Sequence, residues 1–404
     1  MTKLAICIPN YNRLKKLEGL ITEIISQIKI YGLHDDVQII VSDDCSEVDP
    51  THMVETLISH NTDIDIRYKR FNENRGMDYN FVNSVMLSDA EFAWIIGNDD
   101  IPVNDGIYKA IILLNKYDQI DFLVTPFDTF TDDLSERLIE QLPFGNKYST
   151  GKVFDTSNKS ELNELLYSVK ANFGLFGFLS NVIFRRSYWS QYVYDNLFSN
   201  KMHTIFIQVY MHLRTLLNGA LYVYNPTKII INRSGDEIAT SDKRLYDVAI
   251  GLYDVIDFYF QGDVRDHLTR IIVDPYINGR TWNFPGTRKI QDLKTDKVEL
   301  YKRLFVDEKD LDTLKKFDVY IYGAGKYGRK TESKLRDKKI EVKGFIDQNW
   351  ETLRNIENIE VISIDELKRR LTSNTYVFIA NAKDTVDIYK LLATNNVLNI
   401  GVLI

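Results

Sequence analysis

Short apolar runs alternate with amphipathic segments over the first hundred residues, and this alternation restricts the fold more than any other feature of the chain. The runs that predict strands are Leu4–Pro9, Val37–Ser42, Ile64–Arg70 and Phe92–Ile96. The segments that predict helices lie between them, at Leu14–Ile30, Val54–His60 and Tyr79–Leu87. This order favours a mostly parallel, doubly wound α/β sheet.

Polar residues follow three of these strands, at Pro9–Arg13, Ser42–Asp44 and Asn98–Asp100. Ligands of doubly wound sheets bind beyond the carboxyl ends of the strands, so the three polar runs predict one site. In the third run, two adjacent carboxylates follow an apolar strand directly. Buried charge needs a partner, and a divalent metal on a diphosphate is one candidate. The alternative is a helix cap or an acidic turn.

Composition excludes several classes of protein. The chain has 404 residues, enough for two or three domains, and is 44% hydrophobic and 26% charged, as globular proteins are. A net charge of −7 argues against a general nucleic-acid binder. Cys7 and Cys45 are too few for a disulfide framework, which favours the reducing cytoplasm. We expect no signal peptide and, without a run of 18 apolar residues, no transmembrane helix.

The middle of the chain shows a mixed pattern. Three strands are predicted, at Asp121–Pro126, Asn181–Arg185 and Leu221–Tyr224, with a helix at Phe206–Leu217 and a polar loop or hairpin at Thr129–Thr150. From Glu237 to Lys316 the pattern is helical and gives no strand signal. Tyr246–Phe260 is apolar enough that we expect it to pack on another element.

A new strand–helix series begins at Phe317. Strand Val319–Tyr322 runs into a loop with Gly323, Gly325 and Gly328, and Asp347 ends the next strand 19 residues after Gly328. Glycines at this point let a backbone approach a phosphate, and the acid is placed to hold a ribose. The alternative is that the glycines serve helix–strand packing alone. We predict a small Rossmann-like domain with, at most, one nucleotide site.

Four motifs in the N-terminal half resemble the family-two glycosyltransferases of the GT-A fold, in the family's order and roughly its spacing: Ile8–Arg13, Ile40–Ser46, Asn72–Gly76 and Asn98–Asp100. Residues 177–186 are similar to the family's acceptor-side strand. The C-terminal part resembles accessory domains of bacterial surface-polysaccharide enzymes. The predicted division is a GT-A domain at 1–235, a helical segment at 236–316 and a Rossmann-like domain at 317–404.

The resemblance implies a nucleotide-sugar site. Asp43 matches the acid that accepts the ring N–H of the base, which favours uracil, and Asp99 faces the ribose and sugar. Arg75 contacts phosphate or base, and Arg233 is placed to hold the diphosphate. The remaining residues assigned to this pocket are Pro9, Tyr11, Arg13, Asp44, Gly76 and Asn98.

The implied cofactor is Mg²⁺ or Mn²⁺, with Asp100 as the metal ligand. Asn98 replaces the first acid of the usual acid-x-acid motif. Two outcomes are open: the metal site is weakened, or Asp100 and the donor phosphates suffice. Magnesium keeps several waters and needs few protein ligands.

The acceptor base departs from the family pattern. The family's base lies six residues before an arginine in a helix, and the frame of Arg214 and Gly219 puts Gln208 at that position. A glutamine side chain cannot take the acceptor proton. Asp195 and His203 are the substitutes we consider, the alternatives being a surface acid and a loop histidine.

We therefore expect a cytoplasmic glycosyltransferase that moves a sugar from a nucleotide-sugar, a UDP-sugar by the Asp43 argument, to a glycan or lipid-linked acceptor. Self-association and peripheral contact with the inner face of the membrane are left open. Asn98 and Gln208 motivate a rival class, a non-catalytic binding or scaffold protein. A second rival is a nucleotide-sugar oxidoreductase. This reading, centred on the C-terminal domain, lacks support, because no Tyr-x-x-x-Lys dyad follows the glycine loop, where Tyr389 and Lys390 are adjacent.

Overall fold

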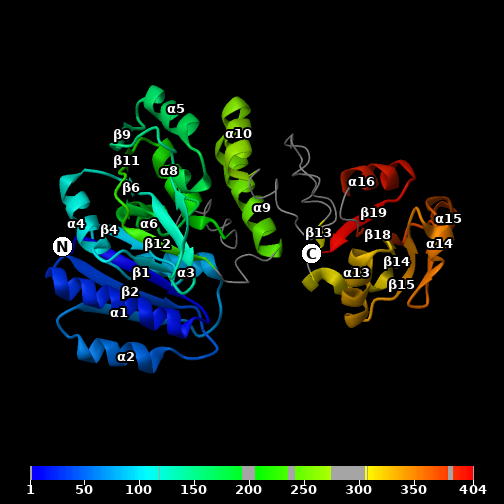
Figure 1. Cartoon of the computed structure of the whole chain (residues 1–404), viewed down its shortest axis with the longest axis horizontal. Helices are drawn as coiled ribbons and strands as arrows, with labels where there is room; N and C mark the ends of the chain where they lie inside the picture. Colours follow the sequence, from blue (N-terminus) through cyan, green and yellow to red (C-terminus); the bar gives the residue numbers. More distant parts are fainter. Residues whose placement is uncertain are drawn as a thin grey trace. The chain divides into compact units, whose positions relative to one another are not determined.

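The computed structural model describes residues 2–117, 119–192, 205–234, 242–273, 305–306, 308–380 and 385–403. The chain forms two compact units (Figure 1). The first comprises Met1–Ala239 and Gly251–Ile272, and the second comprises Thr240–Ile250 and Val273–Ile404. The first unit holds every element of the predicted glycosyltransferase site.

An eight-stranded sheet forms the centre of the first unit, in the order β3-β2-β1-β4-β10-β6-β11-β9. The first four are parallel and confirm the predicted N-terminal strands: β1 (Leu4–Asn10), β2 (Val37–Asp43), β3 (Asp65–Arg70) and β4 (Phe92–Ile95). The others are β10 (Val182–Arg185), which is antiparallel to β4 and β6, β6 (Phe122–Val124), β11 (Leu221–Tyr224) and β9 (Lys152–Asp155).

Helices connect these strands as the alternation predicts: α1 (Leu14–Tyr31), α2 (Thr51–His60), α3 (Met77–Met86) and α4 (Gly106–Lys116). The helical spacing of α1 buries Leu17, Leu20, Ile21, Ile24 and Ile28 in a core shared with β1, β2 and β4. Helix α3 packs on β1 and β2, so its first turn lies near the carboxyl ends of both strands. The later helices of this unit are α5 (Lys159–Ser168), α6 (Ser187–Tyr192) and α8 (Ile207–Leu217).

A second, four-stranded sheet lies beside the first, in the order β5-β12-β7-β8. It contains β5 (Asp100–Pro102), β12 (Ile230–Ser234) and the hairpin of β7 (Phe127–Thr131) and β8 (Arg137–Gln141). The predicted loop or hairpin at Thr129–Thr150 is therefore a hairpin over its first part. Strand β12 is antiparallel to β5 and places Asn232 opposite Asp100, which joins two polar positions far apart in sequence.

The predicted helical segment is described only in part. It contains α9 (Asp242–Tyr259), α10 (Gly262–Leu268), a π-helical turn at Thr269–Val273 and a 3-10 helix at Glu308–Lys316. The predicted packing is confirmed for the second half of α9, since Leu252, Tyr253 and Ile256 are buried and Tyr259 donates to the Tyr210 carbonyl at 2.8 Å. The expectation of no strand is wrong at β13 (Phe305–Val306), which is too short to leave a sequence pattern. No helix in the described ranges is long and apolar enough to span a membrane.

The second unit is a largely parallel sheet in the order β13-β19-β18-β14-β15-β17-β16. The central strands are β14 (Asp318–Tyr322), β15 (Val342–Ile346), β17 (Ile359–Ile362), β18 (Thr375–Ile379) and β19 (Asn399–Leu403), with a short β16 (Asn355–Ile356) at the edge. The helices are α13 (Lys326–Asp337), α14 (Trp350–Leu353), α15 (Ile364–Arg370) and α16 (Thr385–Thr394). Two apolar clusters and this strand order agree with a doubly wound sheet.

One buried histidine allows a test of the first unit's core. His212 of α8 lies against the rings of Phe184, Phe176 and Phe122, with centroids 4.5, 5.0 and 5.2 Å away. Burial lowers the pKa of His212 to about 3. In the unfolded chain an ordinary pKa near ~6.5 applies. The unfolded chain therefore binds a proton at His212 before the folded protein does. The free energy of unfolding decreases for this reason as the pH falls from about 6.5 towards 3.

We expect His212→Phe, which keeps an aromatic ring and removes the titrating group, to resist acid better than the wild type. The free energy of unfolding of the wild type relative to the variant should drop by about 2 kcal/mol between pH 7.5 and pH 5. Urea unfolding of both proteins at the two pH values measures this change. A difference that does not vary with pH contradicts the assignment.

Candidate active site

The carboxyl ends of β1, β2 and β4 bring the three predicted polar runs together. Asn10 lies opposite Asp43 in the parallel register of β1 and β2. The Asn10 side chain donates from Nδ2 to Asp43 Oδ1 at 2.7 Å and accepts at Oδ1 from Asn98 Nδ2 at 2.7 Å. All three side chains are at least nine-tenths buried. The three polar strand ends are thus joined by a continuous chain of hydrogen bonds, while their role as one ligand site stays a prediction.

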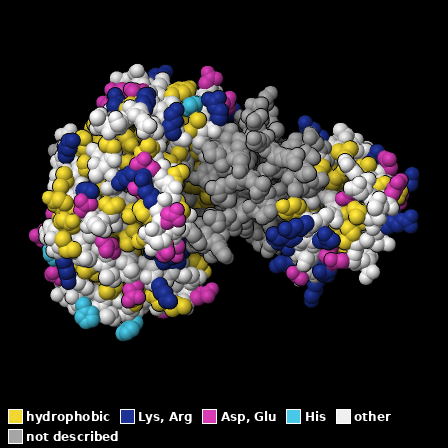
Figure 2. Space-filling view, in the orientation of Figure 1, with side chains coloured by type: hydrophobic (Ala, Val, Ile, Leu, Met, Phe, Trp, Pro, Cys, Tyr) yellow, Lys and Arg dark blue, Asp and Glu magenta, His cyan; other side chains and the backbone are white. Residues whose placement is uncertain are grey.

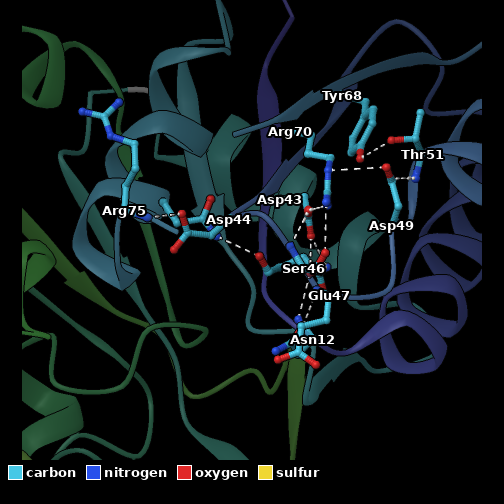
Figure 3. Close-up of polar contacts among 12 residues, drawn as sticks. Asn12, Asp43, Asp44, Ser46, Glu47, Asp49, Thr51, Tyr68, Arg70 and Arg75 are labelled. Atoms are coloured by element: carbon cyan, nitrogen blue, oxygen red, sulfur yellow. Dashed lines mark hydrogen bonds and ion pairs between the residues drawn. The ribbon is translucent and has the colours of Figure 1, made fainter. Parts of the chain in front are cut away.

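Asp43 lies at the centre of a polar network (Figure 3). Its carboxylate accepts from the Ser46 backbone N–H at 3.0 Å and from Arg70 Nη1 at 2.6 Å, as well as from Asn10. The Asp43 residue has no exposed surface. A nucleobase N–H would have to share a carboxylate oxygen with these protein donors, so base recognition by Asp43 stays a prediction.

The loops that follow β1 and β2 are interlocked. Asn12 donates its backbone N–H to Ser46 Oγ at 2.9 Å, and its side-chain oxygen accepts from the Glu47 N–H at 2.7 Å. Asn12 and Cys45 both have left-handed backbone angles, with φ of 56° and 60°. Such conformations are disfavoured for residues other than glycine and persist where the surrounding structure fixes them. The loop that carries Pro9, Tyr11 and Arg13 is thus held in one shape, with the Tyr11 ring partly exposed.

Asp44 fixes the start of α3. Its carboxylate accepts from the backbone N–H groups of Arg75 at 2.8 Å and Gly76 at 2.9 Å, and burial raises its pKa. Gly76 needs a φ of 91°, which explains why glycine stands there. The Arg75 guanidinium lies 4.7 Å from the Tyr79 ring and points away from Asp43 (Figure 3). Asp44 therefore shapes the loop that presents Arg75.

Helix α3 in turn holds the start of α8. Asp78 accepts from the backbone N–H groups of Ile205 at 3.0 Å and Ile207 at 3.2 Å. Gln208, at the expected position of the acceptor base, follows directly and is buried, and its Oε1 has no partner among the residues that the structure describes. Asp195 and His203, the two predicted substitutes, lie outside the described residues.

Asp100 lies where the two sheets meet. Its Oδ1 accepts from Asn232 Nδ2 at 2.9 Å and its Oδ2 accepts from Ser180 Oγ. Ser180 Oγ also accepts from the Gly97 N–H at 3.0 Å. The carboxylate is fully buried among neutral hydrogen-bond donors, and this burial raises the pKa of Asp100 to about 7. A cation at this point would compensate the charge that burial disfavours.

Three cationic side chains surround the adjacent turn. Arg13 and Lys16 pair with the Asp99 carboxylate, Lys16 at 2.9 Å. Arg233 donates from Nε to the Asp99 carbonyl at 2.7 Å and from Nη2 to the Asn98 carbonyl at 2.9 Å. The predicted residues Arg13, Asp99 and Arg233 are thus brought together. Their arrangement is suited to a phosphorylated ligand, because guanidinium groups bind phosphate oxygens well.

Residues 5–185 match the family described as glycosyl transferase family 2. This part of the chain is a family 2 glycosyltransferase domain. The chain is also 24% identical over 333 residues to the abequosyltransferase RfbV of Salmonella typhimurium, an alignment that covers 79% of this chain and 94% of that protein. The fold and the enzyme class expected from the sequence motifs are therefore confirmed.

Solved structures with some similarity include S. aureus TarS 1–349 in complex with UDP, at 15% identity and a TM-score of 0.46, covering 66% of this chain and 70% of that one. The mannosyltransferase PcManGT from Pyrobaculum calidifontis, in complex with GDP-Man and Mn²⁺, is 12% identical with a TM-score of 0.46 and covers 67% of each chain. At these scores the two structures carry no argument about residue roles in this glycosyltransferase.

The metal ligands of this glycosyltransferase stay a prediction. No cluster of three or more His, Cys, Asp and Glu side chains suited to a metal occurs in the described part of the chain. Asp99 and Asp100 are the adjacent pair at the site. Because Asp99 pairs with Arg13 and Lys16, Asp100 is the carboxylate whose protein partners leave its charge uncompensated.

The glycine loop of the second unit is built around Asp347. The Asp347 carboxylate accepts from the backbone N–H groups of Ala324 and Asn349, both at 2.9 Å. A Cβ on Gly328 would lie 1.9 Å from the Gly323 carbonyl oxygen, whereas one on Gly325 would meet open space. Asp347 therefore holds the loop itself, and Gly328 serves close packing. Helix α13 exposes Lys326, Arg329 and Lys330. Figure 2 shows Lys and Arg side chains gathered on one face of this unit. Nucleotide binding here stays a prediction.

Several residues of the site did not stand out in the sequence. Ser180 directly precedes the predicted strand at Asn181–Arg185, and Asn232 directly precedes Arg233, but neither residue belongs to a motif of its own. Lys16, Arg70 and Asp78 lie on α1, β3 and α3, which are predicted from the spacing of their apolar residues and not from polar motifs. Lys16 and Asp78 lie in the first turns of α1 and α3 and Arg70 ends β3, so these positions could have suggested the three residues.

We expect Ser180→Ala to lower the free energy of unfolding by about 2–3 kcal/mol, because it leaves the Gly97 N–H and one Asp100 oxygen without their partner. Ser84→Ala is the matched control. Ser84 is equally buried, but its Oγ bonds only the Phe81 carbonyl within α3, so a loss of about 1 kcal/mol is expected. Urea unfolding measures both variants, and equal losses would contradict a special role for Ser180.

Proposed function

We propose that this glycosyltransferase moves a sugar from a nucleoside-diphosphate sugar to a glycan or lipid-linked acceptor during synthesis of a bacterial surface polysaccharide. The observation that carries the proposal is the meeting of Asp99 and Asp100 with Arg13, Lys16 and Arg233 at the carboxyl ends of the strands. Similarity to a bacterial abequosyltransferase supports glycosyl transfer by a chain of this type.

The proposed donor is a uracil nucleotide. Asp43 is the carboxylate at the end of β2, and a carboxylate accepts the ring N–H that uracil presents. Asn10 and Arg70 hold that carboxylate in one orientation, and Tyr11 offers a partly exposed ring on the adjoining loop. Thymine presents the same N–H, so stronger binding of thymidine diphosphate would count against this part of the proposal.

The proposed metal ligand is Asp100, for Mg²⁺ or Mn²⁺. The residues present fit a divalent cation, since carboxylate oxygen is the ligand that these metals prefer. The buried Asp100 carboxylate also lacks a positive partner strong enough to keep its pKa low. The metal would supply charge stabilisation for the departing diphosphate. Arg13, Lys16 and Arg233 are placed to bind the phosphates and hold them beside Asp100.

The acceptor hydroxyl needs a base, and Gln208 cannot serve as one. We propose Asp195 or His203 for this role, because Asp195 is the only carboxylate in the sequence between Glu164 and Asp236 and His203 lies four residues before α8. Their reference pKa values, near ~3.9 and ~6.5, separate them in a pH–rate profile. An inflection of the pH–rate profile near ~6.5 that is absent in His203→Gln would identify His203 as the base.

Asp100→Asn tests the proposed chemistry. It keeps the size of the side chain and removes the charge, so we expect transfer from a UDP-sugar with Mn²⁺ to fall by about a hundredfold or more. The melting temperature should change little, because removal of a buried charge offsets the loss of one of the two oxygens that accept from Asn232 and Ser180. The matched control is Asp105→Asn, since Asp105 is half exposed and pairs with Lys109 one turn into α4. Release of UDP measures the reaction.

The outcomes separate the rival functions. Full activity of Asp100→Asn would contradict the metal assignment. Binding of nucleotide-sugars by the wild type without turnover would favour the scaffold protein instead. Reduction of a nicotinamide cofactor with a nucleotide-sugar would favour the oxidoreductase.

A further inference from the structure

Asn98 stands where the resemblance places the first acid of an acid-x-acid motif, and it faces the protein interior. The residue is 5% exposed. Its amide group donates to Asn10 Oδ1 at 2.7 Å, and its backbone carbonyl accepts from Arg233 Nη2 at 2.9 Å. Asn98 thus bonds Asn10, which in turn bonds Asp43, on one side and Arg233 on the other.

The chemistry of the neighbours dictates an amide at this position. A carboxylate only accepts hydrogen bonds, so Asn10 must direct its NH₂ group to Asp43. The same NH₂ group lies 3.2 Å from Ser46 Oγ. The Asn10 oxygen is then left facing residue 98, which must donate. An aspartate there would set a carboxylate against a carbonyl oxygen in a buried place, which is costly.

The Asn10 backbone cannot easily move to relieve such a conflict. Its carbonyl accepts from the Asp44 N–H at 2.9 Å and from Asn80 Nδ2 at 3.1 Å, and β1 is paired with β2 up to this residue. The orientation of the Asn10 side chain is therefore set by hydrogen bonds on all sides.

We propose that Asn98 is a positioning residue. Its amide donates to the Asn10 oxygen and so fixes the Asn10 amide in the orientation that donates to Asp43. This aligns the base side of the donor pocket with the diphosphate side. This role rests on the proposed function for its connection to a nucleotide-sugar. Asn98 is thereby distinguished from a degraded metal ligand. The direct consequence is that Asn98→Asp, which restores the acid of the usual motif, weakens the site.

The order of donors can be reversed by a second change. In Asp43→Asn the side chain at 43 offers an NH₂ group, so Asn10 can turn its oxygen towards it and its own NH₂ group towards residue 98. In the combination Asn98→Asp with Asp43→Asn, the Asn10 amide again meets one donor and one acceptor. The Ser46 hydroxyl, which donates to Asp43 Oδ1 in the wild type, can donate to the Asn10 oxygen instead, and the net charge of the wild type is kept. Asp43→Asn alone removes a carboxylate that pairs with Arg70 and so changes stability by itself. The effect of Asn98→Asp is therefore measured separately in the wild type and in Asp43→Asn.

Melting temperatures without any ligand test this order. We expect Asn98→Asp to lower the melting temperature of the wild type by about 4 °C or more, and to lower that of Asp43→Asn by less than about 2 °C. Equal losses in the two backgrounds would overturn the proposal. The matched control is Asn225→Asp. Asn225 is buried, and in the described part of the chain its side chain is bonded through its oxygen, which accepts from the Thr227 N–H at 3.0 Å, a bond that an aspartate can also accept.

Calorimetry with uridine diphosphate and manganese chloride tests the connection to the donor. We expect Asn98→Asp to raise the Kd at least about tenfold, and Asn225→Asp to leave it unchanged. A tighter manganese-dependent Kd in Asn98→Asp would overturn the proposal and make residue 98 a missing metal ligand. If the wild type does not bind the nucleotide, the proposed function fails, while the melting temperatures still decide the role of Asn98.

Discussion

The buried carboxylate of Asp100 is the interaction on which the arrangement of the site depends. Ser180 reaches it from the residues before β10, Asn232 reaches it from β12, and the carboxylate itself begins β5. These elements belong to two different sheets and come from distant parts of the sequence. Burying this charge among neutral donors is unfavourable alone, as the raised pKa shows, so the fold holds a group whose charge a cation would stabilise.

The rest of the site is arranged around this point in two halves. On one side, Asn10, Asp43 and Arg70 form a rigid polar network at the ends of β1 and β2. On the other, Arg13, Lys16 and Arg233 surround the turn before Asp100. A nucleoside diphosphate has the matching division, an uncharged base at one end and an anionic diphosphate at the other. The family 2 glycosyltransferase domain therefore offers a chemical match to that class of ligand.

The sequence predicted the strands and the presence of polar groups at their ends, because the apolar periodicity of the first hundred residues is strong and strand ends of a doubly wound sheet converge. It did not predict Ser180 as a partner of Asp100, since that contact depends on the position of β10 between β4 and β6. For Asn98 the sequence left two outcomes open, a weakened metal site or a site in which Asp100 and the donor phosphates suffice. The proposed role of the Asn98 amide depends on the orientation of Asn10, which presents its side-chain oxygen to residue 98 in the folded network.

The most direct test of the account is a thermal-shift panel of nucleotide-sugars on the full chain, with Mn²⁺ or with a chelator. At about a hundredfold excess over Kd, a bound donor stabilises the folded state by about 2.7 kcal/mol. With Mn²⁺ we expect UDP-sugars to raise the melting temperature more than GDP-sugars do, and we expect the chelator to remove most of the shift. Equal shifts with and without the metal, or no shift with any nucleotide-sugar, would contradict this account.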